Sequence, residues 1–250
     1  MEDIQGVAFD LFDTLIMVRN LSLDEAIGRV IHSLQVQGLT IEAEHFTLVY
    51  RQTSRQFIEQ ARRDGRESHN RFWISNTLSR LGHDVQPDDC RIAQAVEAYF
   101  SAFLEFSEAL PKTRDMLTVL QSKFRLGLVS NFTHGPAARD ILERHGLSVF
   151  FDVIVISGEF GYRKPHSRIF DELGYQLGIS NTKIAYVGDD VENDVTGAHQ
   201  AGMRPIFTQY AKQFKGMSTQ TPLEHAEIVK RLSVPTITNW EDLQTLLCIV

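Results

Sequence analysis

The stretch Gly6-Val7-Ala8-Phe9-Asp10-Leu11-Phe12-Asp13-Thr14 decides the fold, because a short apolar run ends there in carboxylates. A run of four apolar residues bounded by polar ones predicts a buried strand. Further runs of this kind lie at Arg125–Ser130, Val153–Ser157, Ile184–Val187 and Pro205–Thr208. The stretches between most of them have helical periodicity. This alternation predicts an α/β fold whose parallel sheet is covered on both faces.

The alternation is interrupted between about Met17 and Ser107. Amphipathic helices are predicted there at Leu23–Gln37, Ile41–Arg63, Ser68–Leu81 and Pro87–Leu104, with glycine-containing turns between them. We therefore predict an all-helical insert over residues 17–108, and an α/β core formed by residues 1–16 and 109–250. A weaker run at Pro235–Thr238 predicts an edge strand, followed by a final helix from Trp240.

Composition limits the class of protein and its partners. The formal net charge is −7 and the isoelectric point about 5.7, so nucleic acid or an anionic membrane would not be attracted over long range. Any phosphate would have to be bound locally. Cys90 and Cys248 are far apart, which predicts two reduced thiols rather than a disulfide framework or a zinc site. With no long apolar run, we expect a cytoplasmic protein without membrane contact. No oligomeric state is predicted.

Polar residues follow several predicted strands at their carboxyl ends. Asp10 and Asp13 follow the first strand, Ser130-Asn131 close the second, and Asp189, Asp190 and Asp194 follow Val187-Gly188. Lys164 lies between the last two groups. Ligands bind at the carboxyl ends of strands in open parallel sheets. Carboxylates, a hydroxyl and a lysine meeting there predict a hard-cation site beside an anion site, which is what phosphoryl transfer requires.

The chain resembles the haloacid dehalogenase-like (HAD) hydrolases, with a C1-type cap at the position of the helical insert. The matching stretches, in family order, are Phe9-Asp10-Leu11-Phe12-Asp13-Thr14-Leu15, Val129-Ser130-Asn131, Gly161-Tyr162-Arg163-Lys164-Pro165 and Val187-Gly188-Asp189-Asp190-Val191-Glu192-Asn193-Asp194. The resemblance covers nearly the whole chain. It implies a Rossmann-like core with an inserted all-helical cap domain, and a Mg²⁺-dependent hydrolase acting on a small phosphorylated metabolite.

The resemblance also implies roles for single residues. Asp10 would be the nucleophile and form a covalent intermediate. Mg²⁺ would be held by Asp10, the backbone carbonyl of Phe12 and Asp189, with Asp194 as an outer ligand or a group that orients Lys164. Asp190 competes for the metal role. Substrate would contact Ser130, Asn131 and Lys164, and Thr14 would stabilise the loop after the first strand.

The chain departs from the family pattern at Phe12. Phosphatases of the family usually carry a second aspartate there, which protonates the leaving group, and phenylalanine cannot transfer a proton. Asp13 is the nearest substitute. Haloacid dehalogenases often have an aromatic residue at this position, so a dehalogenase using Asp10 on carbon is the main alternative, although Asp189 would repel a carboxylate substrate. A phosphate-binding protein without turnover is a third reading.

Two further expectations concern lysines and the cap. Relatives that cleave carbon–phosphorus bonds need a cap lysine for a Schiff base, and the chain has no lysine before Lys112, which excludes that branch. Lys215 is expected to be an ordinary surface lysine. In capped relatives, cap residues select the substrate, so we expect Arg19 and the cluster Arg66, His69 and Arg71 to be candidates for binding a second anionic group.

Overall fold

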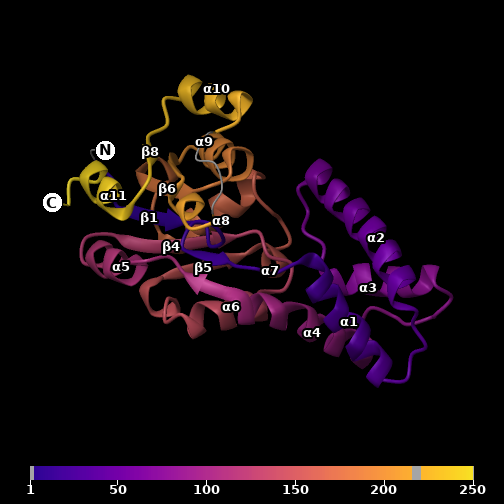
Figure 1. Ribbon diagram of the computed structural model, residues 1–250. Helices are drawn as coiled ribbons and strands as arrows, with labels where there is room; N and C mark the ends of the chain where they lie inside the picture. Colours follow the sequence, from indigo (N-terminus) through magenta and orange to yellow (C-terminus); the bar gives the residue numbers. More distant parts are fainter. Residues whose placement is uncertain (1–2, 216–220, 250) are drawn as a thin grey trace.

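The chain forms a parallel sheet flanked by helices, with a group of four helices to one side (Figure 1). The computed structural model describes residues 3–215 and 221–249. Strands are β1 Gly6–Phe9, β2 Ile16–Val18, β3 Ser107–Ala109, β4 Arg125–Ser130, β5 Val153–Ile156, β6 Ile184–Gly188, β7 Arg204–Thr208 and β8 Thr236–Ile237. Helices are α1 Leu23–Val36, α2 Ala43–Asp64, α3 Asn70–Arg80, α4 Cys90–Phe106, α5 Thr113–Gln121, α6 Gly135–Arg144, α7 Ser157–Phe160, α8 Ser167–Leu177, α9 Gly197–Gln200, α10 Leu223–Arg231 and α11 Trp240–Leu246. Shorter helical turns are Ser148–Phe150, Asn181–Lys183 and Tyr210–Gln213, and a π-helix covers Val191–Thr196.

The main sheet has six strands in the order β5-β4-β1-β6-β7-β8, and all neighbouring pairs are parallel. Strand β1 is central, with Phe9 opposite Leu128 on one side and Val187 on the other. The ends of β1, β4 and β6 therefore lie at one edge of the sheet, where the predicted site residues follow them. The α/β fold with a Rossmann-like parallel core is confirmed.

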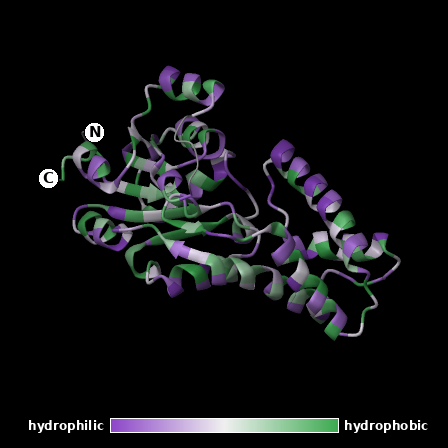
Figure 2. Ribbon diagram, in the orientation of Figure 1, coloured by the Kyte–Doolittle hydropathy of each residue, from purple (hydrophilic) through white to green (hydrophobic). Residues whose placement is uncertain are grey.

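Two hydrophobic layers cover the sheet because successive strand residues point to opposite faces. Val7 and Phe9 pack in a layer with α5, α6 and α11, whereas Ala8 packs in a separate layer with α8. In Figure 2, hydrophobic residues follow the strands, and the surrounding helices alternate between hydrophobic and hydrophilic residues. The three-layer arrangement holds the strand ends rigidly in place.

Helices α1 to α4 form the helical insert, and α1 packs along α4. At its base β2 and β3 form an antiparallel pair, with Met17 opposite Glu108. The four predicted helices are present as α1 to α4, whereas this short ribbon at the boundary of residues 17–108 was not predicted. Strands of three residues are too short to show a period, and the two partners are about 90 residues apart in sequence. That the insert is a separate cap domain stays a prediction.

No helix among residues 3–215 and 221–249 is long and apolar enough to cross a membrane. Cys90 and Cys248 are both free and exposed.

Candidate active site

A buried lysine joins two carboxylates at the edge of the sheet. The Nζ atom of Lys164 lies 2.6 Å from Oδ1 of Asp10 and 2.6 Å from Oδ1 of Asp194. It also donates to the hydroxyl of Tyr186 at 3.1 Å. Lys164 is only 2 % exposed, so these contacts replace most of its hydration. Burial by itself lowers the pKa of Lys164, but the Asp10 and Asp194 carboxylates outweigh burial and raise it above its usual value, so the lysine stays charged.

Three carboxylates lie close enough to share a cation. Oxygen atoms of Asp10, Asp189 and Asp194 are all within 4.8 Å of one another. Burial raises the pKa of Asp189 well above its usual value, and repulsion from Asp10 adds to the shift. Burial also raises the pKa of Asp10 to about 7, with Lys164 opposing and Asp194 adding to the shift. A divalent cation would relieve this crowding of negative charge, so the donor set fits a hard cation such as Mg²⁺.

The π-helix after β6 places Asp194 beside the carboxyl ends of the strands. The π-helix Val191–Thr196 begins after Asp190, and Asp194 Oδ2 accepts a hydrogen bond from the Asp190 amide at 3.0 Å. A Cβ atom on Gly188 would lie 2.3 Å from Cγ of Asp194, so only glycine permits this approach. The Asp190 carboxylate instead caps the π-helix through the amides of Glu192 and Asn193. Asp190 therefore has a structural role.

Asn131 and Thr14 hold neighbouring groups in place. Asn131 accepts a hydrogen bond from the Lys164 amide at 2.8 Å and donates to the Lys164 carbonyl at 3.0 Å. The side chain therefore fixes the backbone that carries the lysine, and its contact with substrate stays a prediction. Thr14 is fully buried, and its hydroxyl donates to Oδ1 of Asp189 at 3.5 Å.

Ser130 has a buried side-chain oxygen without a hydrogen-bond partner, unlike the other predicted site residues in the described part of the chain. It is 1 % exposed, and its Oγ has no hydrogen-bond partner within the described residues. A buried hydroxyl without a partner is costly. Its place at the end of β4, the strand next to β1, suits a hydroxyl that donates to an oxygen of a bound phosphoryl group.

The structure gives Phe12, Asp13 and Arg19 other contacts. Phe12 stacks on Phe132, with ring centroids 4.9 Å apart, so its side chain belongs to an apolar cluster under α4. Asp13 has a left-handed backbone with φ of 60°, and its Oδ2 lies 2.7 Å from Nζ of Lys215. Lys215 is therefore not an ordinary surface lysine.

Arg19 pairs with Glu108 across the β2–β3 ribbon at 3.2 Å. Its contacts among the described residues are with Met17, Phe106 and Glu108, and not with the carboxylates at the sheet edge. Its predicted role toward an anionic substrate is therefore still a prediction.

Sequence patterns did not indicate Tyr186 or Glu67. Tyr186 lies inside an apolar strand, where it looks like core, yet its hydroxyl contacts Lys164 and lies 3.4 Å from Oδ1 of Asp194. Glu67 comes from the helical insert with a side chain 1 % exposed, and it accepts a hydrogen bond from Ser157 at 2.8 Å. The sequence offers one weak indication of these two residues: Tyr186 places a hydroxyl in an apolar strand, and Glu67 places a carboxylate beside a predicted helix.

Hydrogen bonds join the helical insert to the loop that precedes Lys164. The Glu67 amide donates to the Gly161 carbonyl at 3.0 Å, and the Arg163 amide donates to the Gly65 carbonyl at 2.9 Å. Arg163 also approaches the Glu67 carboxylate at 3.5 Å. The position of the catalytic lysine candidate therefore depends on the insert as well as on the sheet.

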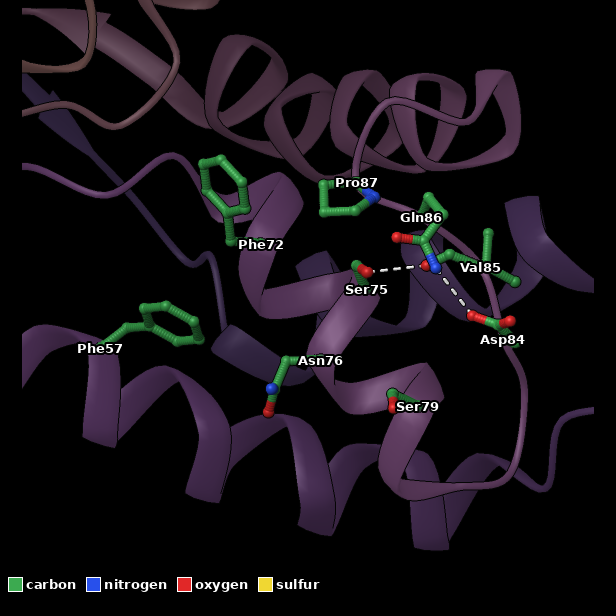
Figure 3. Close-up of a pocket in the computed structure, with 9 residues that line it drawn as sticks. All are labelled: Phe57, Phe72, Ser75, Asn76, Ser79, Asp84, Val85, Gln86 and Pro87. Atoms are coloured by element: carbon green, nitrogen blue, oxygen red, sulfur yellow. Dashed lines mark hydrogen bonds between the residues drawn. The ribbon is translucent and has the colours of Figure 1, made fainter.

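A hollow of about 330 Å³ lies elsewhere in the insert, between α2, α3 and the turn before α4 (Figure 3). Two hydrogen bonds lie within its lining: Ser75 donates to the Val85 carbonyl at 2.7 Å, and Gln86 donates to Asp84 at 2.7 Å. It contains none of the predicted site residues. We therefore place the chemistry at the sheet edge.

Comparison with known proteins shows the family of the chain. The family model for haloacid dehalogenase-like hydrolases matches residues 4–202. A glyceraldehyde 3-phosphate phosphatase from Methanopyrus kandleri is 32% identical over 84% of this chain and 85% of its own length. Among solved structures, a 2-haloacid dehalogenase from Pseudomonas syringae has a TM-score of 0.66, with 24% identity and 98% of each chain covered. A magnesium-bound HAD hydrolase from Bacillus subtilis has a TM-score of 0.60, with 19% identity, covering 99% of this chain and 100% of that one. The chain belongs to the haloacid dehalogenase-like hydrolases.

Proposed function

We propose that this protein is a Mg²⁺-dependent phosphatase that hydrolyses a small phosphorylated metabolite through an aspartyl-phosphate on Asp10. The proposal is carried by the group of Asp10, Asp189 and Asp194 around the buried Lys164, because this arrangement combines a cation site with a fixed positive charge. The phosphatase from Methanopyrus kandleri, similar over most of both chains, supports the same class of substrate. We further propose that the protein acts in the cytoplasm.

Mg²⁺ would be held by Asp10, Asp189 and the Phe12 carbonyl. Asp194 would act as an outer ligand, which contacts a metal-bound water rather than the ion. Bound there, Mg²⁺ supplies positive charge that offsets the charge on the phosphoryl oxygens and favours ionised Asp10. Ser130 Oγ would donate to one phosphoryl oxygen, and the Lys164 ammonium would offset charge on the nucleophile. Held in this way, the phosphorus atom would lie within reach of Asp10, and the hydrogen bond from Thr14 would keep Asp189 oriented.

In the first step an Asp10 carboxylate oxygen attacks phosphorus, the bond from phosphorus to the ester oxygen breaks, and the ester oxygen keeps the bonding electron pair and takes up a proton, so that the alcohol leaves. In the second step the oxygen of a water molecule attacks the phosphorus of the aspartyl-phosphate, and the bond from phosphorus to the Asp10 oxygen breaks. The water proton goes to solvent or to the phosphate, inorganic phosphate is released, and the Asp10 carboxylate is restored. Asp13, held beside Lys215, or solvent would supply the first proton, because Phe12 has none to give.

Because Phe12 cannot act as a general acid, we expect a preference for esters whose leaving group needs no proton. p-Nitrophenyl phosphate, whose leaving group needs no proton, should react at least tenfold faster than an alkyl phosphate. Hydrolysis should stop in EDTA and return with Mg²⁺. Acid quenching with radiolabelled phosphate ester should trap phosphoenzyme in the native protein and none in Asp10→Asn. Phosphoenzyme in Asp10→Asn, or no phosphate release from any ester with Mg²⁺, would refute the proposal.

The apolar surroundings of Phe12 favour a dehalogenase as the second candidate. There, Asp10 would attack carbon, the halide would leave without a proton, and no metal would be required. The half-buried carboxylate of Asp189, which would repel a carboxylate substrate, argues against it. Release of chloride from 2-chloropropionate in EDTA, without phosphatase activity, would favour this second function.

A further inference from the structure

A buried carboxylate of the helical insert takes no part in the proposed chemistry. The side chain of Glu67, between α2 and α3, is 1 % exposed, which is comparable with the 3 % and 2 % of Lys164 and Asp194 in the candidate active site. A carboxylate removed from water destabilises a fold unless positive charge and hydrogen bonds compensate for its lost hydration. Glu67 therefore needs partners, and the α/β core supplies two of them.

Both oxygens of the Glu67 carboxylate are used. Oε2 accepts a hydrogen bond from the Ser157 hydroxyl at 2.8 Å, and Oε1 accepts one from the Ser68 amide at 3.1 Å. Nη1 of Arg163 lies 3.5 Å from Oε1 and supplies positive charge. Because Ser157 and Arg163 belong to the core, the carboxylate joins the insert to two separate segments of the core.

Ser157 connects Glu67 to the loop after β4. Ser157 is fully buried, and its Oγ accepts a hydrogen bond from the Phe132 amide at 2.9 Å. Its single hydroxyl hydrogen points to Glu67, because the charged Oε2 at 2.8 Å is a closer and stronger acceptor than the Phe132 carbonyl at 3.4 Å. That carbonyl accepts a hydrogen bond from the Gly158 amide at 3.0 Å. Since Phe132 is two residues after Ser130, these bonds fix the loop that carries Ser130.

The backbone of Glu67 holds the loop that carries Lys164. The Glu67 amide donates to the Gly161 carbonyl at 3.0 Å, and Arg163, which the carboxylate approaches, directly precedes Lys164. The Lys164 amide in turn donates to Oδ1 of Asn131 at 2.8 Å. Asn131 lies in the loop after β4, so a closed circuit of hydrogen bonds and backbone joins Glu67 to both loops. Networks in which every member is bonded hold their parts more rigidly than single contacts do.

We infer that Glu67 is a positioning residue, which holds the loop of Ser130 and the loop of Lys164 in a fixed arrangement relative to each other. The inference rests on the proposed phosphatase function and deepens it. Among the described residues, the contacts of Glu67 do not include the carboxylates at the sheet edge, so it acts through Ser157 and the backbone. Ser130 and Lys164 must both meet one phosphoryl group, and a displacement of about 1 Å can cost about 10²-fold in rate.

Glu67→Leu removes both accepting oxygens and leaves the proposed metal ligands in place. The kcat for Mg²⁺-supported hydrolysis of p-nitrophenyl phosphate should fall about 30-fold or more, with KM within about threefold of the native value. Binding of Mg²⁺ alone, measured by titration calorimetry, should stay within about twofold. Glu67→Gln keeps an oxygen for the Ser157 hydroxyl, so its kcat should return to within about fivefold of native. Glu44→Leu, the same substitution at an exposed position of α2, should leave kcat unchanged.

A double-mutant cycle separates positioning from loss of the fold. Ser157→Ala breaks the same link at its core end, so it should lower kcat about tenfold or more. The double variant of Glu67→Leu and Ser157→Ala should be no slower than the slower single variant, because both substitutions remove one shared hydrogen bond. Each rate is measured well below the unfolding temperature of that variant, so that unfolded chain does not contribute to the loss.

Several results would overturn the positioning role and leave the phosphatase standing. They are a kcat of Glu67→Leu within about threefold of native, an equal loss in Glu67→Gln, and losses that multiply in the double variant. If Glu67→Leu does not fold, native kcat in Ser157→Ala overturns the role. No phosphate release from any ester by the native protein would overturn the proposed function as well.

Discussion

Lys164→Met tests the electrostatic core of the site. The lysine ammonium lies 2.6 Å from each of two buried carboxylates, Asp10 and Asp194. At an effective dielectric constant of about 20, each contact is worth about 6 kcal/mol. Desolvation of the ions and repulsion between the two carboxylates offset much of this. Breaking a buried ion pair by removing one partner typically costs about 3–5 kcal/mol in the free energy of unfolding.

For a protein of this size, that loss lowers the unfolding temperature by on the order of 10 °C. Removing a preorganised cation from beside developing negative charge should also lower kcat by about 10²–10³-fold. The two effects are separable with a second substitution. Asp194→Asn in the Lys164→Met background removes one of the unpaired carboxylates, so it should recover part of the stability and none of the activity.

The assays are calorimetric or circular-dichroism unfolding and Mg²⁺-supported hydrolysis of p-nitrophenyl phosphate, both at pH 8. Lys230→Ala is the control, because Lys230 is exposed on α10. Lys215 is unsuitable, since it pairs with Asp13. An unfolding temperature within 2 °C of the native protein and kcat within threefold would refute the reasoning, because a buried cation between two carboxylates cannot be removed without consequence.

Three further perturbations address the metal, the sheet edge and pH. Asp189→Asn should weaken activation by Mg²⁺ at least tenfold in a metal titration, because one charged ligand is lost; native activity that survives EDTA would contradict this. Gly188→Ala would place a Cβ atom 2.3 Å from Cγ of Asp194, so kcat should fall at least tenfold, and an unchanged rate would show that the loop yields freely. Burial, with His134 adding, lowers the pKa of His69 from 6.5 to about 4, so the folded protein binds fewer protons than the unfolded chain, and stability is lost as pH falls from 6.5 towards 4. The full shift corresponds to about 3 kcal/mol, and partial solvation should leave roughly half. His69→Gln should flatten the unfolding free energy over this range, whereas the exposed His32→Gln should leave the native slope.

The strand ends could be predicted from the sequence because a buried strand and the polar residues that follow it are contiguous in the chain. Strands β1 and β4 have the predicted bounds, since a continuous apolar run has few alternatives in a parallel sheet. Once the strands are parallel and neighbouring, the residues after them must lie at one edge of the sheet, which is why Asp10, Asp189 and Ser130 could be predicted to lie there. The β2–β3 ribbon was not found, because three-residue strands show no period.

Contacts between distant parts of the chain could not be read in this way. Asp10 and Lys164 are 154 positions apart, and no local pattern shows that the lysine would point inward between two carboxylates. Nor does any pattern show that Asn131 would clamp the Lys164 backbone, or that Glu67 would reach Ser157 from the helical insert.

Periodicity and strand ends therefore determined the α/β fold and the chemical class of the site. Tertiary structure alone decided which polar groups are satisfied. Ser130 looks like a turn or helix-cap residue in the sequence, and only the packing at the end of β4 leaves its hydroxyl buried without a hydrogen-bond partner among the described residues. The reason is physical: a residue's type fixes how many hydrogen bonds it can make, but its neighbours in space decide how many it does make.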